Sequence, residues 1–509
     1  MHSRLFVLAL VALLSACSQL PTRPEMPPAT ALPPASQGPL SEWTGPQEQA
    51  HAGQAGFRLV SNGVEAFALR ARSARMAHDS LDIQTYIWHG DMTGLLLAQR
   101  ALEAADRGVR VRILVDDMDA RAKNRGFAAL DAHPNIEVRM FNPFASRKGT
   151  WGKVSDLGTD FKRLNHRMHN KSWIADNRIA LVGGRNLGDE YFGASEETNF
   201  VDLDLLMAGP VVGQISASFD RFWNAPSNYP IATLSPDDAN AAALEKVRPQ
   251  LLASIDAIRN SAYARAVQDD SGVQAWMDGS TELRWSDQWR FVSDDPMKLE
   301  MGDGDQRSNV AAALLPVLQS TQQRAHLISP YFVPGDRGTA LLVDLAKSGR
   351  DVKILTNSLA ANDVAAVHGG YSRYRPTLLE GGVQIWELKP LGEANDNFSL
   401  KGSSGSSLHT KALVIDERQI FVGSYNLDPR STSLNSEQGV LVSDPQLAAQ
   451  LEQIFQTQVS PAHAWKVEQV DGDLRWSDGS ETFDKEPKAS ASRRMQAWLM
   501  KILPVQSQL

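Results

Sequence analysis

A pattern of three polar residues occurs twice in this chain, and the two copies share one register. Each copy reads His-x-Lys-x4-Asp and leads, at the same distance, to Gly-x-x-Asn. The residues concerned are His169, Lys171, Asp176 and Asn186 in the first copy and His409, Lys411, Asp416 and Asn426 in the second. A constant offset of 240 residues relates the copies from the His to the Asn. Such a duplication predicts two halves that fold on one plan.

The residue types of this pattern suit the chemistry of a phosphodiester. A His and a Lys two positions apart on a strand point to the same face, so each copy presents an imidazole and an ammonium together. Two such faces would hold one phosphate with cations and amides, while one His attacks phosphorus and the other protonates the leaving oxygen. The set requires no metal and no cofactor. Asp176 and Asp416 complete the pattern and count among the candidate catalytic residues. The alternative is two unrelated histidines, each satisfied in its own core.

Further segments, taken with the two motifs, resemble the C-type cardiolipin synthases of Gram-negative bacteria, within the phospholipase D superfamily. These segments are residues 86–88 (Tyr-Ile-Trp), 141–144 (Phe-Asn-Pro-Phe), 167–171, 356–363 and 427–431 (Leu-Asp-Pro-Arg-Ser). The resemblance covers nearly the whole chain beyond about residue 55. It implies a metal-independent reaction that passes through a phosphohistidine.

The resemblance also implies a role for each polar residue. His169 would be the nucleophile and His409 the general acid. The phosphate ligands would be Lys171, Lys411, Asn186, Asn426 and Ser424. The family usually has a Ser where this chain has Gly184, so the first half lacks one hydroxyl donor that Ser424 supplies in the second half.

The family places an acidic partner behind each His, on the strand after Gly-x-x-Asn. Aligning Gly209-Pro210 with Asp444-Pro445 matches Asp202 with Glu437. Each would fix the tautomer of a catalytic His and stabilise its imidazolium form. Asp204 is the competing candidate in the first half.

The net charge of −8 disfavours nucleic acid as the partner, because proteins that bind polyanions usually carry a basic excess. The N-terminus instead indicates a membrane. An apolar run too short to span a bilayer precedes Leu14-Ser15-Ala16-Cys17, which resembles a bacterial lipobox. We expect cleavage before Cys17, lipidation of that residue and a location facing the periplasm; Ser18 resembles sorting to the outer membrane. The alternative is a free Cys17 after an ordinary signal peptide.

The order of elements predicts an α/β fold of two phospholipase D-like half-domains related by a pseudo-twofold axis, each a mixed, mostly parallel sheet flanked by helices. The expected segments are a signal peptide (1–16), a Pro-rich tether (17–45), the first half (46–230), a connecting helical region (231–295), the second half (296–470) and a C-terminal extension (471–509). The histidine pair is expected at the seam between the halves.

Three segments leave alternatives open. The basic loop 146–167 and the Gly/Ser-rich loop 401–407 would form lips over lipid headgroups, or would be ordinary solvated loops. Near the C-terminus, Arg493 and Arg494 precede apolar residues that share one helical face. This helix would lie in the membrane interface or dock on the protein, and we favour attachment through the lipid anchor alone.

The leading functional hypothesis is phosphatidyl transfer that makes cardiolipin, with phosphatidylglycerol and also phosphatidylethanolamine as candidate lipids. Hydrolysis of phospholipids to phosphatidic acid is the runner-up, because the same residues would serve with water as acceptor. A nuclease or general phosphodiesterase comes third. A non-catalytic lipid-binding scaffold is the remaining class, and the presence of both complete motifs argues against it. The sequence names no protein partner.

Overall fold

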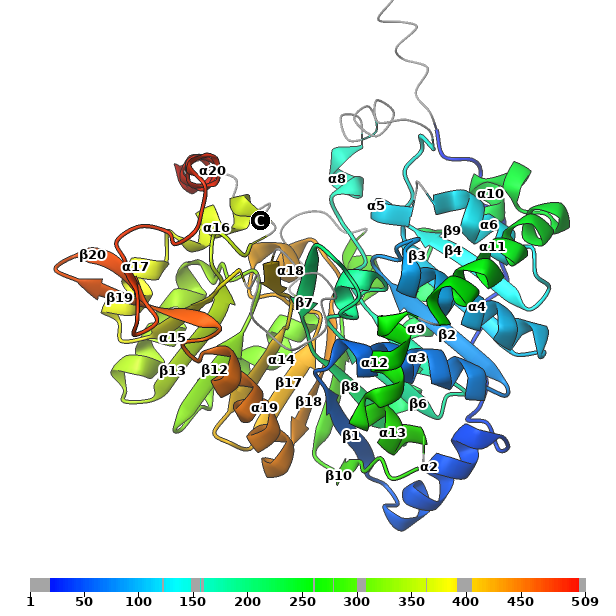
Figure 1. The fold of residues 1–509 in the computed structure, drawn as a ribbon, viewed down its shortest axis with the longest axis horizontal. Helices are drawn as coiled ribbons and strands as arrows, with labels where there is room; N and C mark the ends of the chain where they lie inside the picture. Colours follow the sequence, from blue (N-terminus) through cyan, green and yellow to red (C-terminus); the bar gives the residue numbers. More distant parts are fainter. Residues whose placement is uncertain are drawn as a thin grey trace, which may run out of the picture.

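The computed structural model describes residues 19–120, 123–147, 156, 160–259, 261–277, 279–299, 308–362, 364–390 and 405–502. Two large sheets lie in it, one built mainly from each half of the chain (Figure 1). The predicted mixed α/β fold with two similar halves is confirmed. Cys17 lies outside the described residues, so its lipidation stays a prediction.

The two sheets have matching strand orders around the motifs. The first contains β1 (Ala55–Val60), β2 (Ser80–Thr85), β3 (Arg110–Asp116), β4 (Ile136–Phe141), β5 (Ser172–Ala175), β6 (Ile179–Gly183), β8 (Asp204–Ala208), β9 (Asn228–Pro230) and β10 (Arg284–Ser286), in the order β10-β1-β8-β6-β5-β2-β3-β4-β9. The second contains β11 (Trp289–Ser293), β12 (Arg324–Ile328), β13 (Asp351–Asn357), β14 (Gln384–Leu388), β16 (Ala412–Ile415), β17 (Gln419–Gly423), β18 (Gln438–Ser443), β19 (Ala464–Val470), β20 (Asp473–Ser477) and β21 (Thr482–Phe483), in the order β11-β18-β17-β16-β12-β13-β14-β19-β20-β21. Thus β8-β6-β5-β2-β3-β4 corresponds to β18-β17-β16-β12-β13-β14.

Only the middle of each sheet is parallel. β2, β3 and β4 are parallel neighbours, as are β12, β13 and β14. Each motif strand instead forms an antiparallel hairpin, β5 with β6 and β16 with β17. The share of parallel pairing is therefore smaller than the strand–helix–strand pattern predicts, because a hairpin returns the chain through the sheet without a crossover helix.

Helices cover both faces of each sheet. The outer face of the first sheet carries α3 (Gly63–Met76), α4 (Met92–Asp106) and α6 (Asn124–Asp131), and that of the second carries α14 (Asn309–Gln319), α15 (Gly335–Lys347) and α17 (Arg375–Glu380). Between the sheets lie α9 (Pro210–Trp223) and α19 (Pro445–Gln458), whose apolar side chains share one core with strands of both halves. This shared core fixes how the halves meet.

The remaining helices are short or peripheral. They are α2 (Pro39–Ala50), α5 (Asp117–Ala120), α8 (Phe161–Leu164), α10 (Ile231–Leu234), α11 (Ala241–Arg259), α12 (Ala262–Asp269), α13 (Ser271–Met277), α16 (Ala365–Tyr371), α18 (Pro429–Ser433) and α20 (Ala491–Ile502), with 3-10 turns η2 (Asp189–Tyr191), η3 (Pro236–Asp238) and η4 (Pro296–Leu299). Among the described residues, no helix is both long and apolar enough to cross a bilayer.

The connecting region packs onto the first half. α11 contacts α4 and α6, while α12 and α13 contact α3. β10 then joins the first sheet and β11 the second, so one short ribbon links the halves. β11, β20 and β21 all belong to the second sheet, which therefore extends beyond the predicted 296–470 at both ends.

The Pro-rich segment 17–45 is bound to the first half along much of its described length. The Ala31 N–H donates to the Asp220 carboxylate at 2.8 Å, and the Arg178 guanidinium donates to the Ala35 carbonyl at 2.6 Å. The last part of the segment belongs to helix α2. The sequence predicts a tether here; in the described part, from residue 19, these contacts instead form a strap along the first half, because neighbouring polar groups satisfy its backbone.

Asp176 and Asp416 hold the starts of strands and do not face the motif histidines. The buried Asp176 carboxylate accepts the backbone N–H groups of His78, Asp79 and Ser80 at 2.8–3.0 Å. Asp416 makes the same contacts with Gln322, Gln323 and Arg324. Both lie at the hairpin turns, where they have positive φ. This geometry corrects the prediction that the two residues are catalytic. Asp176 anchors β2 and Asp416 anchors β12, each beside its motif strand.

Asp176→Asn should therefore lower stability and leave chemistry intact. The amide keeps one acceptor oxygen, and hydrogen bonds to a charged group contribute about 1.5–3 kcal/mol, so we expect a loss of about 1–3 kcal/mol in the free energy of unfolding. Denaturant titration would measure it, with turnover normalised to folded protein. Asp416→Asn, whose contacts are more exposed, is the matched control and should lose less. A large fall in turnover at unchanged stability would contradict the structural role.

Candidate active site

The two motif histidines lie at the seam, and each is hydrogen-bonded through its backbone to the opposite half. The His169 N–H donates to the Ser436 carbonyl at 3.0 Å, and the Ser436 N–H donates back to the Arg167 carbonyl at 3.0 Å. The His409 N–H donates to the Val201 carbonyl at 2.8 Å. This second contact continues the parallel pair of β7 (Thr198–Val201) with β15 (Gly405–Leu408). The packing of the halves therefore positions both imidazoles.

The acidic partners are exchanged between the halves. His169 Nδ1 lies 2.9 Å from Glu437 Oε2, and His409 Nδ1 lies 2.7 Å from Asp202 Oδ2. Both carboxyl groups are buried. A carboxylate accepts a hydrogen bond from the Nδ1–H group, which leaves the Nε2 atom of each ring for a substrate. Each His thus contacts one of the two acidic partners that the family resemblance implied, Asp202 or Glu437. Each of these carboxyl groups, however, belongs to the opposite half of the chain.

Asp204, the competing candidate, serves the first half instead. It lies fully buried on β8 and pairs with Arg70 at 2.9 Å and with Arg185 at 3.4 Å. Two guanidinium groups of the first half thus compensate the charge of Asp204, and these contacts lie away from the seam between the halves.

The two imidazole–carboxyl pairs differ in charge. Burial, together with Lys171 and Lys411, lowers the pKa of His169 well below its usual range. Burial and Lys411 also lower the pKa of His409, but Asp202 opposes them. Burial raises the pKa of Glu437 to about 7, whereas His409 and Lys411 outweigh burial and lower the pKa of Asp202. The carboxyl group that contacts His409 is therefore ionised more readily than the one that contacts His169.

Aromatic rings enclose the two imidazoles. Tyr86 meets His169 edge-on at 5.2 Å between ring centroids, and the Lys171 ammonium lies 5.3 Å from the Tyr86 ring. Tyr191 and Phe200 flank His409 at 5.3 and 5.2 Å. Such walls exclude water and strengthen electrostatic contacts inside the site. Tyr86 belongs to a segment that carried the family resemblance, so the sequence held a signal for it without indicating its contact.

The two lysines are held in the same way. The Lys171 ammonium donates to the His169 carbonyl at 2.7 Å, and that of Lys411 donates to the His409 carbonyl at 2.6 Å. Both side chains are buried. Each ammonium is thereby placed beside the imidazole two residues earlier, as the period of a strand predicts.

The two asparagines are not equivalent. Asn186 accepts the Ile87 N–H at 3.2 Å and donates to the Tyr191 hydroxyl at 2.8 Å. The buried Asn426 side-chain oxygen finds no partner among the described residues. A phosphate oxygen needs a donor, and the Asn426 Nδ2 atom donates no hydrogen bond within the described residues, whereas Asn186 Nδ2 already donates to Tyr191; Asn426 therefore fits a phosphate ligand better than Asn186 does.

Ser424 binds the acidic partner, which differs from the phosphate contact implied by the resemblance. Its hydroxyl donates to Glu437 at 2.5 Å and accepts the Gln438 N–H at 3.0 Å. At the matching position, a Cβ on Gly184 would lie 2.2 Å from an Asp202 oxygen. The shorter Asp202 thus occupies the space that a Ser would need, which explains the departure from Gly-Ser in the first half.

Several supporting residues were not identified from sequence. Arg167, fully buried, pairs with Asp116 at 3.1 Å, and Asp116 also accepts the Met168 N–H at 2.9 Å. These contacts hold the backbone that leads into His169. The Ser431 hydroxyl donates to Glu437 at 2.8 Å. Arg167 and Ser431 stand in segments that carried the resemblance, but sequence alone did not assign their partners.

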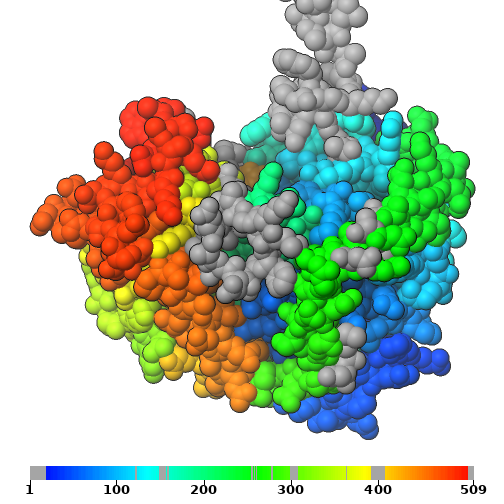
Figure 2. All heavy atoms as spheres, in the orientation of Figure 1, coloured from blue at the N-terminus to red at the C-terminus, as the bar shows by residue number. Residues whose placement is uncertain are grey.

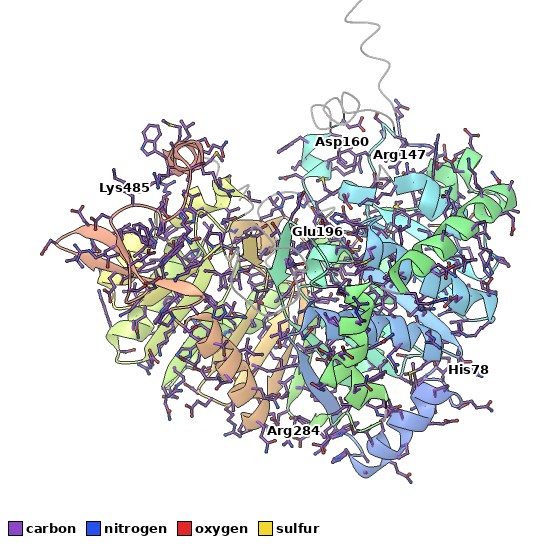
Figure 3. The ribbon with its side chains drawn as sticks, in the orientation of Figure 1. His78, Arg147, Asp160, Glu196, Arg284 and Lys485 are labelled. Carbon is purple, nitrogen blue, oxygen red and sulfur yellow. The ribbon has the colours of Figure 1, made fainter. Side chains whose placement is uncertain are left out.

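The basic residues before the first motif are largely engaged where the structure describes them. Arg147 pairs with Asp117 at 2.6 Å, and Arg163 pairs with Asp160 at 2.5 Å. Arg147 and Asp160 lie near α8 on the upper side of the molecule (Figure 3). Lys148 and Lys153 lie outside the described residues, as does the loop 401–404. That the two loops cover lipid headgroups therefore stays a prediction. Fewer cations are available for this role than the sequence suggests.

Two clusters within the described chain have ligand atoms close enough for a metal ion, and both lie apart from the motif residues. They are His89, Asp91 and Glu190, and His368, Glu387 and Glu486. In the first, His89 pairs with Glu190 at 3.0 Å, and Asp91 caps α4. In the second, Arg375 pairs with both carboxylates. Internal partners therefore already compensate both clusters.

Comparison with known proteins gives one consistent family. The family model described as "Cardiolipin synthase, PLD-like domain" matches residues 72–223 and 314–459. Cardiolipin synthase C of Escherichia coli K12 is 41% identical over 90% of this chain and 96% of its own length. Cardiolipin synthase A of Pseudomonas putida GB-1 is 24% identical over 78% of this chain and 67% of its own. A phosphatidylserine synthase structure from Haemophilus influenzae shares the fold, with a TM-score of 0.57 at 14% identity over 92% of this chain and 100% of that one.

Removing the Ser424 hydroxyl should shift the pH dependence of turnover. A hydrogen bond to the ionised form lowers a pKa, so in Ser424→Ala the pKa of Glu437, already about 7, should rise further. If the ionised carboxylate is needed to orient His169, the acid limb of the pH–rate profile moves to higher pH by about one unit. Thr432→Val, which removes a nearby hydroxyl that contacts Tyr425, is the control and should not move it. An unmoved acid limb in Ser424→Ala would exclude this role.

Proposed function

The chain belongs to the cardiolipin synthase family with phospholipase D-like domains, and we propose that it makes cardiolipin by transferring a phosphatidyl group between phospholipids through a covalent intermediate on His169. The observation that carries this proposal is the exchanged pairing of His169 with Glu437 and of His409 with Asp202. It engages Nδ1 of both rings, and no described residue hydrogen-bonds to either Nε2. Two imidazole nitrogens thus remain for one phosphodiester.

In the first step, His169 Nε2 attacks phosphorus of the donor lipid and an N–P bond forms. The P–O bond to the headgroup alcohol breaks, and His409 Nε2 gives its proton to the leaving oxygen. Lys171, Lys411 and Asn426 hold the non-bridging oxygens, where negative charge is concentrated. A phosphatidyl-histidine and a free headgroup alcohol result.

In the second step, a hydroxyl of another phospholipid attacks the phosphatidyl-histidine. His409 Nε2 now takes the proton of that hydroxyl, a P–O bond forms and the N–P bond breaks, which restores both histidines. With phosphatidylglycerol as donor and acceptor, the products are cardiolipin and glycerol. Phosphatidylethanolamine is the other lipid we propose as a participant.

The electrostatics favour His169 as the nucleophile. Its lowered pKa keeps the imidazole neutral, as an attacking nitrogen must be. His409 faces an ionised Asp202, which stabilises an imidazolium. An anionic substrate phosphate would offset the two lysines that lower the pKa of His409, so the acid gains its proton as the lipid binds.

Hydrolysis is the second candidate, because water could replace the acceptor lipid at the same residues. Incubation of the purified enzyme with labelled phosphatidylglycerol, with and without phosphatidylethanolamine, separates the two outcomes. Transfer yields labelled cardiolipin, and hydrolysis yields phosphatidic acid. Phosphatidic acid as the only product would exclude the synthase.

The histidine roles predict different losses. His169→Ala should lose both turnover and any acid-labile phosphatidyl adduct. His409→Ala should lose turnover by about 10²–10⁴-fold, as expected for one general acid, yet still form the adduct with a donor whose leaving group is activated. Quenching in alkaline denaturant, which preserves the N–P bond, followed by mass spectrometry would detect the adduct, and brief acid treatment should remove it. The reverse pattern would exchange the two roles, and full activity in both variants would contradict the site.

Membrane attachment is the remaining part of the proposal. We propose a lipoprotein anchored at Cys17, facing the periplasm from the outer membrane. The described chain starts on the upper side of Figure 1, where α8 and α20 also lie. Helix α20 packs on α16 next to Gly369, while Met495, Trp498 and Leu499 are 57%, 55% and 42% exposed. The helix projects at the upper left of Figure 2.

These exposures support insertion of α20 into the interface, contrary to our sequence-based preference for the anchor alone. A variant beginning at Gln19, which keeps the strap, should still sediment with anionic vesicles. Trp498→Ala with Leu499→Ala should weaken that binding at least tenfold, because burying one such side chain contributes about 1.5–3 kcal/mol. Leu252→Ala with Leu315→Ala removes equally exposed apolar groups elsewhere and is the matched control. Equal binding by both double variants would rule out insertion of α20.

A further inference from the structure

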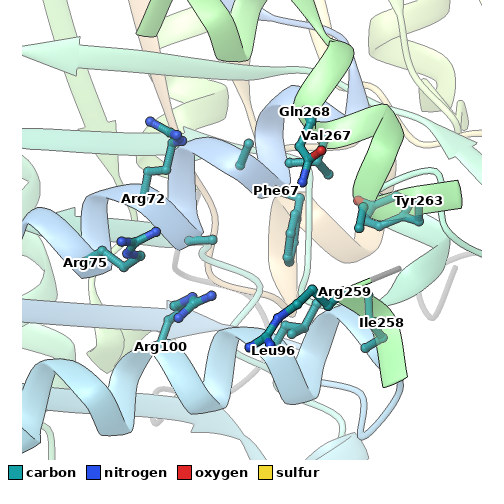
Figure 4. Close-up of a pocket in the computed structure, with 13 residues that line it drawn as sticks. Phe67, Arg72, Arg75, Leu96, Arg100, Ile258, Arg259, Tyr263, Val267 and Gln268 are labelled. Carbon is teal, nitrogen blue, oxygen red and sulfur yellow. The ribbon is translucent and has the colours of Figure 1, made fainter. Parts of the chain in front are cut away.

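An apolar groove lies on the first half, and none of the described residues that line it belongs to the active site. It has a volume of about 300 Å³ and opens between α3, α4 and the connecting helices α11 and α12. Phe67, Leu96, Ile258, Tyr263 and Val267 form its floor and walls (Figure 4). In Figure 2, these connecting helices form the green band across the first half. The volume is at the lower end of small-molecule sites.

Four arginines surround this apolar floor. Arg72 and Arg75 come from α3, Arg100 from α4 and Arg259 from the end of α11 (Figure 4). Arg100 pairs with a glutamate on its own helix, and Arg259 pairs with an aspartate on its own helix in a contact that is about 70% exposed on both sides. Within the described part of the chain, no carboxylate forms an ion pair with Arg72 or Arg75. The four arginines thus gather positive charge on a chain whose net charge is −8.

The second half provides an internal comparison. Its corresponding helices, α14 and α15, line a groove of about 390 Å³. There the residues contributed by α14 are Ala311, Leu314, Leu315 and Leu318, and among the described residues that line the groove Arg337 is the only arginine. A groove between these two helices therefore follows from the fold, whereas the arginine cluster does not. Among the described residues, only the groove of the first half has such a cluster.

We propose that this groove binds an anionic phospholipid, with the phosphate at Arg72 and Arg75 and part of an acyl chain over Phe67 and Tyr263. A guanidinium group can donate two parallel hydrogen bonds to one phosphate, and this preference accounts for the arginines of the groove. The apolar lining accounts for the acyl chain, since among the described lining residues Gln268 and Tyr263 are the only ones with an uncharged polar side chain. The Tyr263 hydroxyl donates to the Phe192 carbonyl at 3.0 Å, so the ring presents its apolar face. This second lipid site goes beyond the transfer reaction and does not depend on it.

The test uses hydrogen–deuterium exchange of the full chain in a neutral detergent, with dihexanoyl phosphatidylglycerol as the probe. We expect slower exchange in peptides from α3 and from 258–268, at a half-saturating lipid concentration that rises at least tenfold in Arg72→Gln with Arg75→Gln. Ala71→Trp, which fills the groove without changing charge, should abolish the effect. Because exchange is read peptide by peptide, protection at the seam reports the active site separately.

Two controls define the ligand. Dihexanoyl phosphatidylcholine should protect these peptides weakly, because its headgroup has no net charge, and inorganic phosphate should not protect them. Arg125→Gln with Arg475→Gln removes the same charge from exposed positions and should leave the protection unchanged. Equal protection by both lipids, protection retained in the Arg72/Arg75 variant, or groove peptides already protected and unaffected by lipid would overturn the proposal. The last outcome would mean that a segment of the chain itself fills the groove.

Discussion

The exchanged imidazole–carboxylate contacts make the active site a property of the seam. Glu437 reaches His169 and Asp202 reaches His409, so neither half contains a complete catalytic pair. Both carboxyl groups are buried, and a buried charge without its partner costs several kcal/mol. The core around α9 and α19 must therefore hold the two halves in one register, since any other packing would leave four ionisable groups unpaired.

Much of this arrangement could be predicted from the sequence because it is local. The two-residue period of a strand places Lys171 beside His169, and the repeated Gly-x-x-Asn marks the end of the second strand of each hairpin. Contacts that depend on how the halves pack could not be predicted in this way. Asp176 belongs to the repeated pattern, but only the structure shows that it binds the start of β2. The exchange of acidic partners likewise requires the seam, which no single segment encodes.

The departure at Gly184 shows how the two halves differ while keeping one plan. Asp202 lies where a side chain at residue 184 would have to be, whereas the longer Glu437 leaves room for the Ser424 hydroxyl. The pairing of Gly184 with Asp202, and of Ser424 with Glu437, therefore follows from the space that each carboxyl side chain occupies. The two carboxyl groups also differ electrostatically: burial raises the pKa of Glu437 to about 7, whereas His409 and Lys411 outweigh burial and lower the pKa of Asp202. Chemically distinct carboxyl groups are what a site needs if its two histidines perform different tasks.

The same logic extends to the outer surfaces, where the halves diverge most. The seam constrains both copies alike, because each supplies part of the other's active site. The outer helix layers have no such mutual requirement. Connecting helices and four arginines border the groove above α3 and α4 in the first half, whereas a single described arginine lines the corresponding groove of the second half. The second half carries α20 with its exposed Trp498 instead. A duplicated fold can thus keep one site at its centre while its two outer surfaces carry different residues.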